Sequence, residues 1–208
     1  MVKLSKEEYS VGMAFLVKPW KKLTIKEILA LSEKNSRSYV NNSLNKLEKG
    51  GIIRKDNVGK TIVYEFILNQ TASINYLGLL EEHNFRMTKI PQQILENLRK
   101  KVPTKFFIMM VTGSYANGKS RKDSDLDVVI ICDNSLEPKK IISELKHEGE
   151  LSIPKVHLYV FKEKEFLEML INKEENYGKE IVRNHKIFIG ATNYYLILKE
   201  ALDHGFKD

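Results

Sequence analysis

The pattern of apolar and polar positions predicts short helices and strands in a different order in the two halves of the chain. The first half is predicted to contain helices at about 5–16, 24–31 and 36–49, then strands at 52–55 and 61–68. The second is predicted to contain strands at 105–111, 126–132, 156–161 and 186–190 and helices at 92–101, 163–173, 177–184 and 193–203. We therefore expect an α+β fold with a domain at 1–70, a helical connector at 71–90 and a second domain at 91–208.

Capping and turn residues define the boundaries of the predicted helices and strands in the first half of the chain. Thr24 and Glu27 have the spacing of a capping box, and Gly50-Gly51 is expected to end the third helix. A hairpin turn is predicted at 56–60. The residues predicted to face the core are Tyr9, Met13 and Leu16 in the first helix, Ile25, Ile28 and Leu29 in the second, and Val40, Leu44 and Leu47 in the third.

One stretch in the second half carries the clearest chemistry. The apolar run 106–111 leads into Gly113-Ser114, and a short polar segment then leads to Asp125 and Asp127 at the start of another apolar run. Alternate residues of a strand share a face, so the two carboxylates are expected side by side, where a divalent cation such as Mg²⁺ would relieve their repulsion. A structural cap or an exposed strand is the alternative, but the apolar run after Asp127 favours a buried strand.

Charge and composition narrow the classes of function. The net charge is +7, and residues 1–70 account for +6 of it. This asymmetry is typical of a nucleic-acid-binding module, although a solvated lysine-rich surface has the same composition. Neither an apolar signal segment nor a run long enough to span a membrane is present, so we expect a cytoplasmic location. Cys132 is the single cysteine and is expected to be a buried thiol.

The order of elements in residues 8–70 resembles a winged helix-turn-helix domain, with 39–53 similar to its recognition helix and first wing strand. The resemblance implies that helix 36–49 enters the major groove of double-stranded DNA, with Lys55 and Lys60 on phosphates. A protein-interaction or dimerisation module is the alternative. The helix residues that face away from the apolar stripe, and would read bases, are Ser36, Arg37, Asn41, Asn42, Asn45 and Lys46.

Gly113-Ser114, followed by ten residues and then Asp125-Leu126-Asp127, resembles the signature of the nucleotidyltransferase superfamily with the polymerase-beta-like fold. The resemblance covers about residues 90–200 and is strongest to the minimal members of that superfamily. It implies an α/β domain with a mixed sheet, in which Gly113, Ser114 and Ser124 bind the nucleotide. Asp125 and Asp127 are implied to be catalytic and to hold Mg²⁺ or Mn²⁺, with a nucleoside triphosphate as substrate.

The sequence departs from that pattern at the third carboxylate. The strand 156–161 has no acid, and His157 stands where the carboxylate is expected. A neutral histidine can accept a proton, but Mg²⁺ prefers oxygen ligands. His157 is thus either a replacement catalytic residue or a packing residue. Glu163 and Glu165 follow closely but are expected to turn away. The loop residues Lys119, Arg121 and Lys122 either steer the triphosphate or form a solvated basic loop.

Two functions follow from these observations. One is a Mg²⁺-dependent nucleotidyltransferase that moves a nucleoside monophosphate to a protein hydroxyl, a small molecule or a nucleic-acid end, coupled to a DNA-binding winged helix. The other is a DNA-binding transcriptional regulator whose nucleotidyltransferase domain has lost turnover and senses nucleotide. A homodimer and a partner protein of toxin–antitoxin type are compatible with both.

Overall fold

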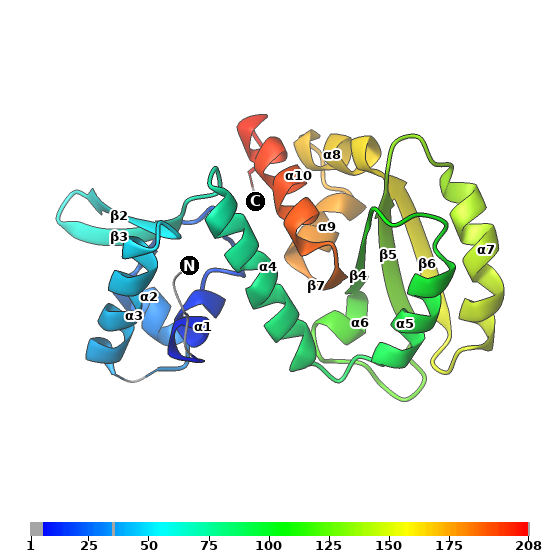
Figure 1. The fold of residues 1–208 in the computed structure, drawn as a ribbon, viewed down its shortest axis with the longest axis horizontal. Coiled ribbons are helices and arrows are strands. Elements are labelled where there is room, and N and C mark those ends of the chain that lie inside the picture. Colours follow the sequence, from blue (N-terminus) through cyan, green and yellow to red (C-terminus); the bar gives the residue numbers. More distant parts are fainter. Residues whose placement is uncertain (1–5, 35, 208) are drawn as a thin grey trace. The chain divides into compact units, whose positions relative to one another are not determined.

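The computed structural model describes residues 6–34 and 36–207, so Ser5 of the first predicted helix and Asn35 of the turn before the third lie outside it. The chain divides into two compact units, residues 1–80 and 81–208, and the division falls inside α4 (Thr71–Arg86) (Figure 1). Among the described helices, none combines the length and the apolar character that a membrane crossing requires.

In its described residues, the first unit contains three complete helices, the first part of α4 and a small antiparallel sheet. Helices α1 (Lys6–Met13), α2 (Ile25–Leu31) and α3 (Arg37–Lys49) are followed by the hairpin of β2 (Ile53–Val58) and β3 (Thr61–Phe66). The two-residue strand β1 (Leu23–Thr24) completes a sheet of order β1-β3-β2. The predicted capping box of α2 is present, because the Thr24 hydroxyl accepts from the Glu27 amide while the Glu27 carboxylate accepts from the Thr24 amide at 2.8 Å.

Packing in this unit confirms part of the predicted core. Val40, Leu44 and Leu47 of α3 are fully buried. The predicted face of the first helix is confirmed only in part. Tyr9 and Met13 are half-buried, but α1 already ends at Met13, before Leu16, and the chain then buries Ala14 and Phe15. In α2 only Ile28 of the predicted stripe is buried.

The hairpin is longer than predicted. Its strands pair from Ile53 opposite Phe66 to Val58 opposite Thr61, which leaves only Gly59 and Lys60 in the turn. Gly59 has a φ of 61°, a conformation that favours glycine. Every residue of β2 after Ile53 is exposed, so this strand has no apolar alternation from which its length could be predicted.

The second unit is built on a mixed four-stranded sheet of order β6-β5-β4-β7, as expected. Strand β4 (Phe107–Thr112) is antiparallel to β5 (Leu126–Cys132) and to β7 (His185–Ile189), whereas β6 (Val156–Lys162) is parallel to β5. The helices of this unit are α5 (Gln92–Lys101), α6 (Gly113–Ala116), α7 (Pro138–Leu151), α8 (Glu163–Ile171), α9 (Tyr177–Arg183) and α10 (Ala191–Asp203).

Helices cover both faces of this sheet. Helices α5 and α7 lie on one side, and α8, α9 and α10 on the other (Figure 1). Strand β5 is buried throughout its apolar run, and Cys132 is 2% exposed, which confirms the buried thiol. The sequence pattern did not identify α7. In α10, Leu196 is half-exposed and its neighbour Ile197 is buried.

Replacing Glu27 with alanine is expected to lower the free energy of unfolding of the first unit by about 1 kcal/mol at pH 7. Hydrogen bonds from the Thr24 amide and hydroxyl lower the pKa of Glu27. The carboxylate therefore stabilises the fold above the usual glutamate pKa of about 4.3, and this contribution disappears as the pH falls through the lowered pKa of the folded state. Urea unfolding followed by the fluorescence of Trp20, the single tryptophan, measures the difference.

The control is Glu48→Ala, which removes an exposed carboxylate from α3. A Glu27→Ala effect that stays constant from pH 7 to pH 3 would contradict the role assigned to the capping box.

Candidate functional site

Two aspartates and a histidine meet at one end of the larger sheet. Asp125 immediately precedes β5, Asp127 is its second residue, and His157 lies opposite Asp127 on the parallel strand β6. His157 Nε2 is 3.3 Å from Asp125 Oδ2, and His157 Nδ1 is 3.6 Å from Asp127 Oδ1. The structure thus brings together the three residues that the sequence singled out as catalytic.

The carboxylate of Asp127 is the more deeply placed of the two. Its side chain is 27% exposed, against 40% for Asp125. Burial raises the pKa of Asp127, and the charge of Asp125 adds to the rise, whereas His157 opposes it. Because the negative charges of Asp125 and Asp127 repel each other, a cation bound between the two carboxylates would stabilise both.

The turn after β4 fits closely against this pair. Gly113 has a φ of 66°, and a Cβ atom built on it would lie 2.3 Å from Asp127 Oδ2. Only glycine combines this backbone conformation with this approach. The glycine therefore fixes how near the turn lies to the carboxylate.

Asn184, which ends α9, holds the same turn from the other side. Its Nδ2 donates to the Gly113 carbonyl at 3.0 Å, and its own carbonyl accepts from the Thr112 hydroxyl at 2.7 Å. Sequence reasoning missed Asn184, because it lies 71 residues from Gly113 and belongs to no local pattern.

The remaining loop residues are placed differently. Ser114 is half-buried in α6, beside the glycine. The Ser124 hydroxyl accepts from the Arg121 amide at 2.8 Å and so closes the loop before Asp125. Lys119, Arg121 and Lys122 are exposed.

The donor set decides which metal arrangement fits. Within the described residues, no group of three or more histidine, cysteine, aspartate or glutamate side chains could hold a metal ion by itself. Two adjacent carboxylates are, however, what Mg²⁺ uses when substrate phosphates supply its other ligands. Asp125 and Asp127 therefore fit a metal shared with a bound phosphate group, and His157 is not a ligand that Mg²⁺ prefers.

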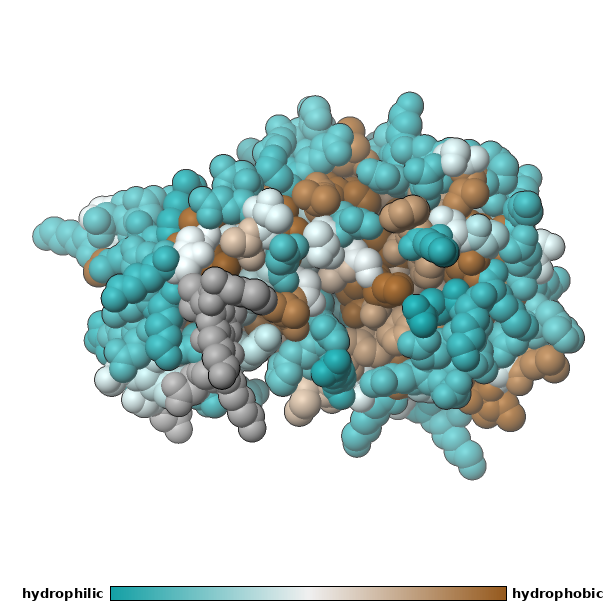
Figure 2. Space-filling view, viewed as in Figure 1, coloured by the Kyte–Doolittle hydropathy of each residue, from teal (hydrophilic) through white to brown (hydrophobic). Residues whose placement is uncertain are grey.

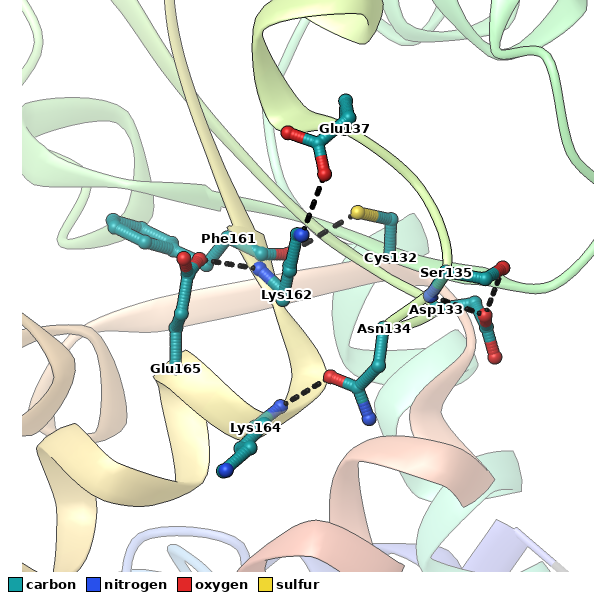
Figure 3. Close-up of polar contacts among 9 residues, drawn as sticks. All are labelled: Cys132, Asp133, Asn134, Ser135, Glu137, Phe161, Lys162, Lys164 and Glu165. Atoms are coloured by element: carbon teal, nitrogen blue, oxygen red, sulfur yellow. Dashed lines mark hydrogen bonds and ion pairs between the residues drawn. The ribbon is translucent and has the colours of Figure 1, made fainter.

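Polar contacts fix the opposite end of β5 and β6 (Figure 3). Cys132 Sγ donates to the Phe161 carbonyl at 3.4 Å, and Lys162 Nζ donates to Glu137 at 2.8 Å. Glu165 accepts from the Lys162 amide at 2.8 Å. Glu165 thus lies at the far end of β6 from the aspartates and does not supply a third carboxylate there.

A basic groove in the first unit contains several of the residues predicted to bind DNA. The groove has a volume of about 760 Å³, and none of the described residues that line it is acidic. The surface over the hairpin is hydrophilic in Figure 2. The groove is lined by Thr24, Ile25, Lys26, Arg37, Asn41, Asn45, Lys55, Lys60, Thr61, Ile62 and Tyr64.

Three predicted DNA contacts do not line this groove. The Ser36 hydroxyl caps α3 by accepting from the Tyr39 amide, and Asn42 is exposed elsewhere on the helix. Lys46 Nζ is 2.6 Å from the buried carboxylate of Glu8. Conversely, sequence reasoning did not include Lys26, which lies on α2 and reaches the groove only through the packing of the helices.

Gly113→Ala is expected to loosen the junction of β4 and α6 by more than the 1–2 kcal/mol, roughly, that a left-handed alanine costs, because its Cβ would collide with Asp127. Gly118→Ala is the matched control, since Gly118 has a φ of 72° but open space around the added atom. Hydrogen exchange of residues 107–112 and 126–132 should rise in the first variant and much less in the second. Equal exchange in both variants would show that the close contact between the Gly113 turn and Asp127 does not stabilise the junction of β4 and α6.

Part of the chain, which includes these residues, is similar to a known protein family. No curated protein matches the chain. A solved structure described as a crystal structure of a toxin–antitoxin with AMP-PNP is 12% identical, and the match covers 55% of this chain and 86% of that chain with a TM-score of 0.39. A similarity of this size supports no inference about fold or function. Residues 91–189, which include Gly113, both aspartates and His157, match the family model of the nucleotidyltransferase domain.

Proposed function

We propose that the protein is a metal-dependent nucleotidyltransferase that moves a nucleoside monophosphate from a nucleoside triphosphate to an acceptor hydroxyl. The carrying observation is the close approach of the Gly113 turn to Asp127, beside Asp125. This arrangement offers a place for phosphates next to a place for a cation. The match of residues 91–189 to the nucleotidyltransferase domain supports the same reaction class.

Each residue of the site is assigned one role in the proposed reaction. Gly113 and Ser114 bind the triphosphate through backbone amides and the serine hydroxyl. Asp125 and Asp127 hold Mg²⁺ or Mn²⁺, which when bound neutralises charge that develops on the phosphates. His157, whose Nε2 lies 3.3 Å from Asp125 Oδ2, is the group that we assign to take the proton of the acceptor hydroxyl. Transfer forms the bond between acceptor oxygen and α-phosphorus and releases pyrophosphate.

The proposed acceptor is a hydroxyl of a partner protein, as in a toxin–antitoxin pair, of a small molecule or of a nucleic-acid end. The proposed second activity belongs to residues 1–70, as a winged helix that binds double-stranded DNA. Its support is the acid-free groove between α3 and the hairpin, which Arg37, Lys55 and Lys60 line together with Lys26. A homodimer on paired half-sites is compatible with this proposal.

A regulator without turnover is the second candidate function, and His157 favours it. The imidazole lies near both carboxylates at the position of the expected third acid. In such a protein the nucleotide would bind and alter DNA binding without being cleaved.

Asp127→Asn is expected to reduce transfer of label from an α-³²P nucleoside triphosphate by at least about 100-fold, because it removes a carboxylate that holds the metal. Asp123→Asn is the control, since Asp123 is an exposed acid of the same loop. The assay uses the full chain with Mg²⁺ or Mn²⁺ and follows both labelled acceptors and pyrophosphate. Nucleotide binding without release of pyrophosphate would contradict the proposed enzyme and support the regulator without turnover.

Lys60→Ala is expected to weaken DNA binding evenly across sequences and to reduce the slope of log K against log salt by about 0.9, because one phosphate contact is lost. Arg37→Ala should instead relax sequence preference, since a base contact is lost. Lys49→Ala is the control, an exposed lysine outside the groove. Fluorescence anisotropy over a salt series measures all three, and binding that is independent of salt would exclude the DNA-binding role.

A further inference from the structure

Helix α9 contacts the Gly113 turn at one end and strand β6 at the other. At its C-terminal end, Asn184 holds the carbonyl of Gly113. At its N-terminal end, Tyr177 packs on Tyr159 and Phe161 of β6, with ring centroids 4.9 Å and 6.2 Å apart. One short helix therefore contacts both the turn after β4 and the edge strand β6.

The order of the strands gives these two ends different chemical surroundings. The sheet runs β6-β5-β4, so the glycine turn lies on one side of the aspartates and the β6 aromatic rings on the other. The phosphates are assigned to the glycine turn. The sugar and base of a bound nucleotide must then extend away from that turn. Toward β6 they would meet the aromatic rings of Tyr159 and Tyr177.

Tyr177 and Tyr159 are suited to bind a ring. Both are half-buried, whereas the core tyrosines Tyr194 and Tyr195 of α10 are each 1% exposed. Tyr159 lies two residues beyond His157 on the same face of β6, about 7 Å further along that strand. Burial, the neighbouring Tyr159 and the charge of Asp127 all raise the pKa of Tyr177, which places this ring within the electrostatic field of the site and keeps its hydroxyl neutral.

The seven residues of α9 extend about 10 Å, so its two ends lie against separate elements, the Gly113 turn and strand β6. Aromatic side chains bind bases by stacking, largely independently of base identity.

We propose that α9 makes the site two-ended: Tyr177, with Tyr159, stacks the base of the nucleoside triphosphate, and Asn184 positions the turn that binds its phosphates. The inference rests on the proposed function, because it assumes that the Gly113 turn receives the phosphates. It adds the base platform and a positioning residue that acts through Gly113.

Two probes separate the two ends: ATP, and inorganic tripolyphosphate, which has no base. Binding of each to the full chain is measured by calorimetry with Mg²⁺. Tyr177→Leu should weaken ATP binding about tenfold and leave tripolyphosphate binding within about twofold. Tyr177→Phe keeps the ring and should bind ATP like the wild type. Asn184→Ala should weaken both probes by the same factor.

Controls come from the opposite end of the sheet. Phe106→Leu and Asn193→Ala change an exposed ring and an exposed amide there and should bind both probes normally. Thermal melting checks the fold of each variant, and Tyr159→Leu provides a second test of the platform if Tyr177→Leu is unstable.

The outcomes separate this inference from the function on which it rests. Loss of both probes in Tyr177→Leu would assign the ring a structural role, and unchanged ATP binding in both leucine variants would overturn the platform. Normal binding of both probes by Asn184→Ala would overturn the positioning role. A wild-type chain that binds neither probe would remove the proposed function itself, and the inference with it.

Discussion

The contact between the Gly113 turn and the Asp127 carboxylate is the constraint on which the candidate site depends. It exists because β4 and β5 are antiparallel neighbours, so the end of one strand meets the start of the other. The buried apolar run of β5 fixes the position of Asp127, and the left-handed glycine lets the backbone reach it. Asn184 then holds the turn from the C-terminal part of the chain. The proposed positions of the phosphates and of the cation both depend on this one packing arrangement.

What the sequence could predict was local. The capping box at Thr24, the buried stripe of α3 and the strand that carries Asp127 all follow from spacing within a few residues, and the structure contains each of them. The alternation of side chains along β5 also predicted that the two aspartates would lie together. The position of His157 was instead implied by the resemblance to the nucleotidyltransferase superfamily, and the parallel register of β5 and β6 puts His157 opposite Asp127.

What it could not predict depends on tertiary packing. Asn184 directly follows α9, and only the fold brings it to the Gly113 turn, which lies 71 residues earlier in the chain. Lys46 looked like an exposed base contact, but it pairs with the buried Glu8 of α1. The first hairpin strand was predicted too short, because β2 is exposed on both faces after Ile53 and leaves no apolar alternation.

His157 is the residue on which the choice between enzyme and sensor turns, since it lies near both carboxylates without being a good magnesium ligand. The most direct measurement is a crystal structure of the full chain with Mn²⁺ and a non-hydrolysable nucleoside triphosphate, with the metal located by its anomalous signal. The account predicts a metal between Asp125 and Asp127, phosphates at Gly113 and Ser114, and His157 displaced from at least one carboxylate. A nucleotide bound elsewhere, with His157 still next to both aspartates and no metal between them, would contradict it.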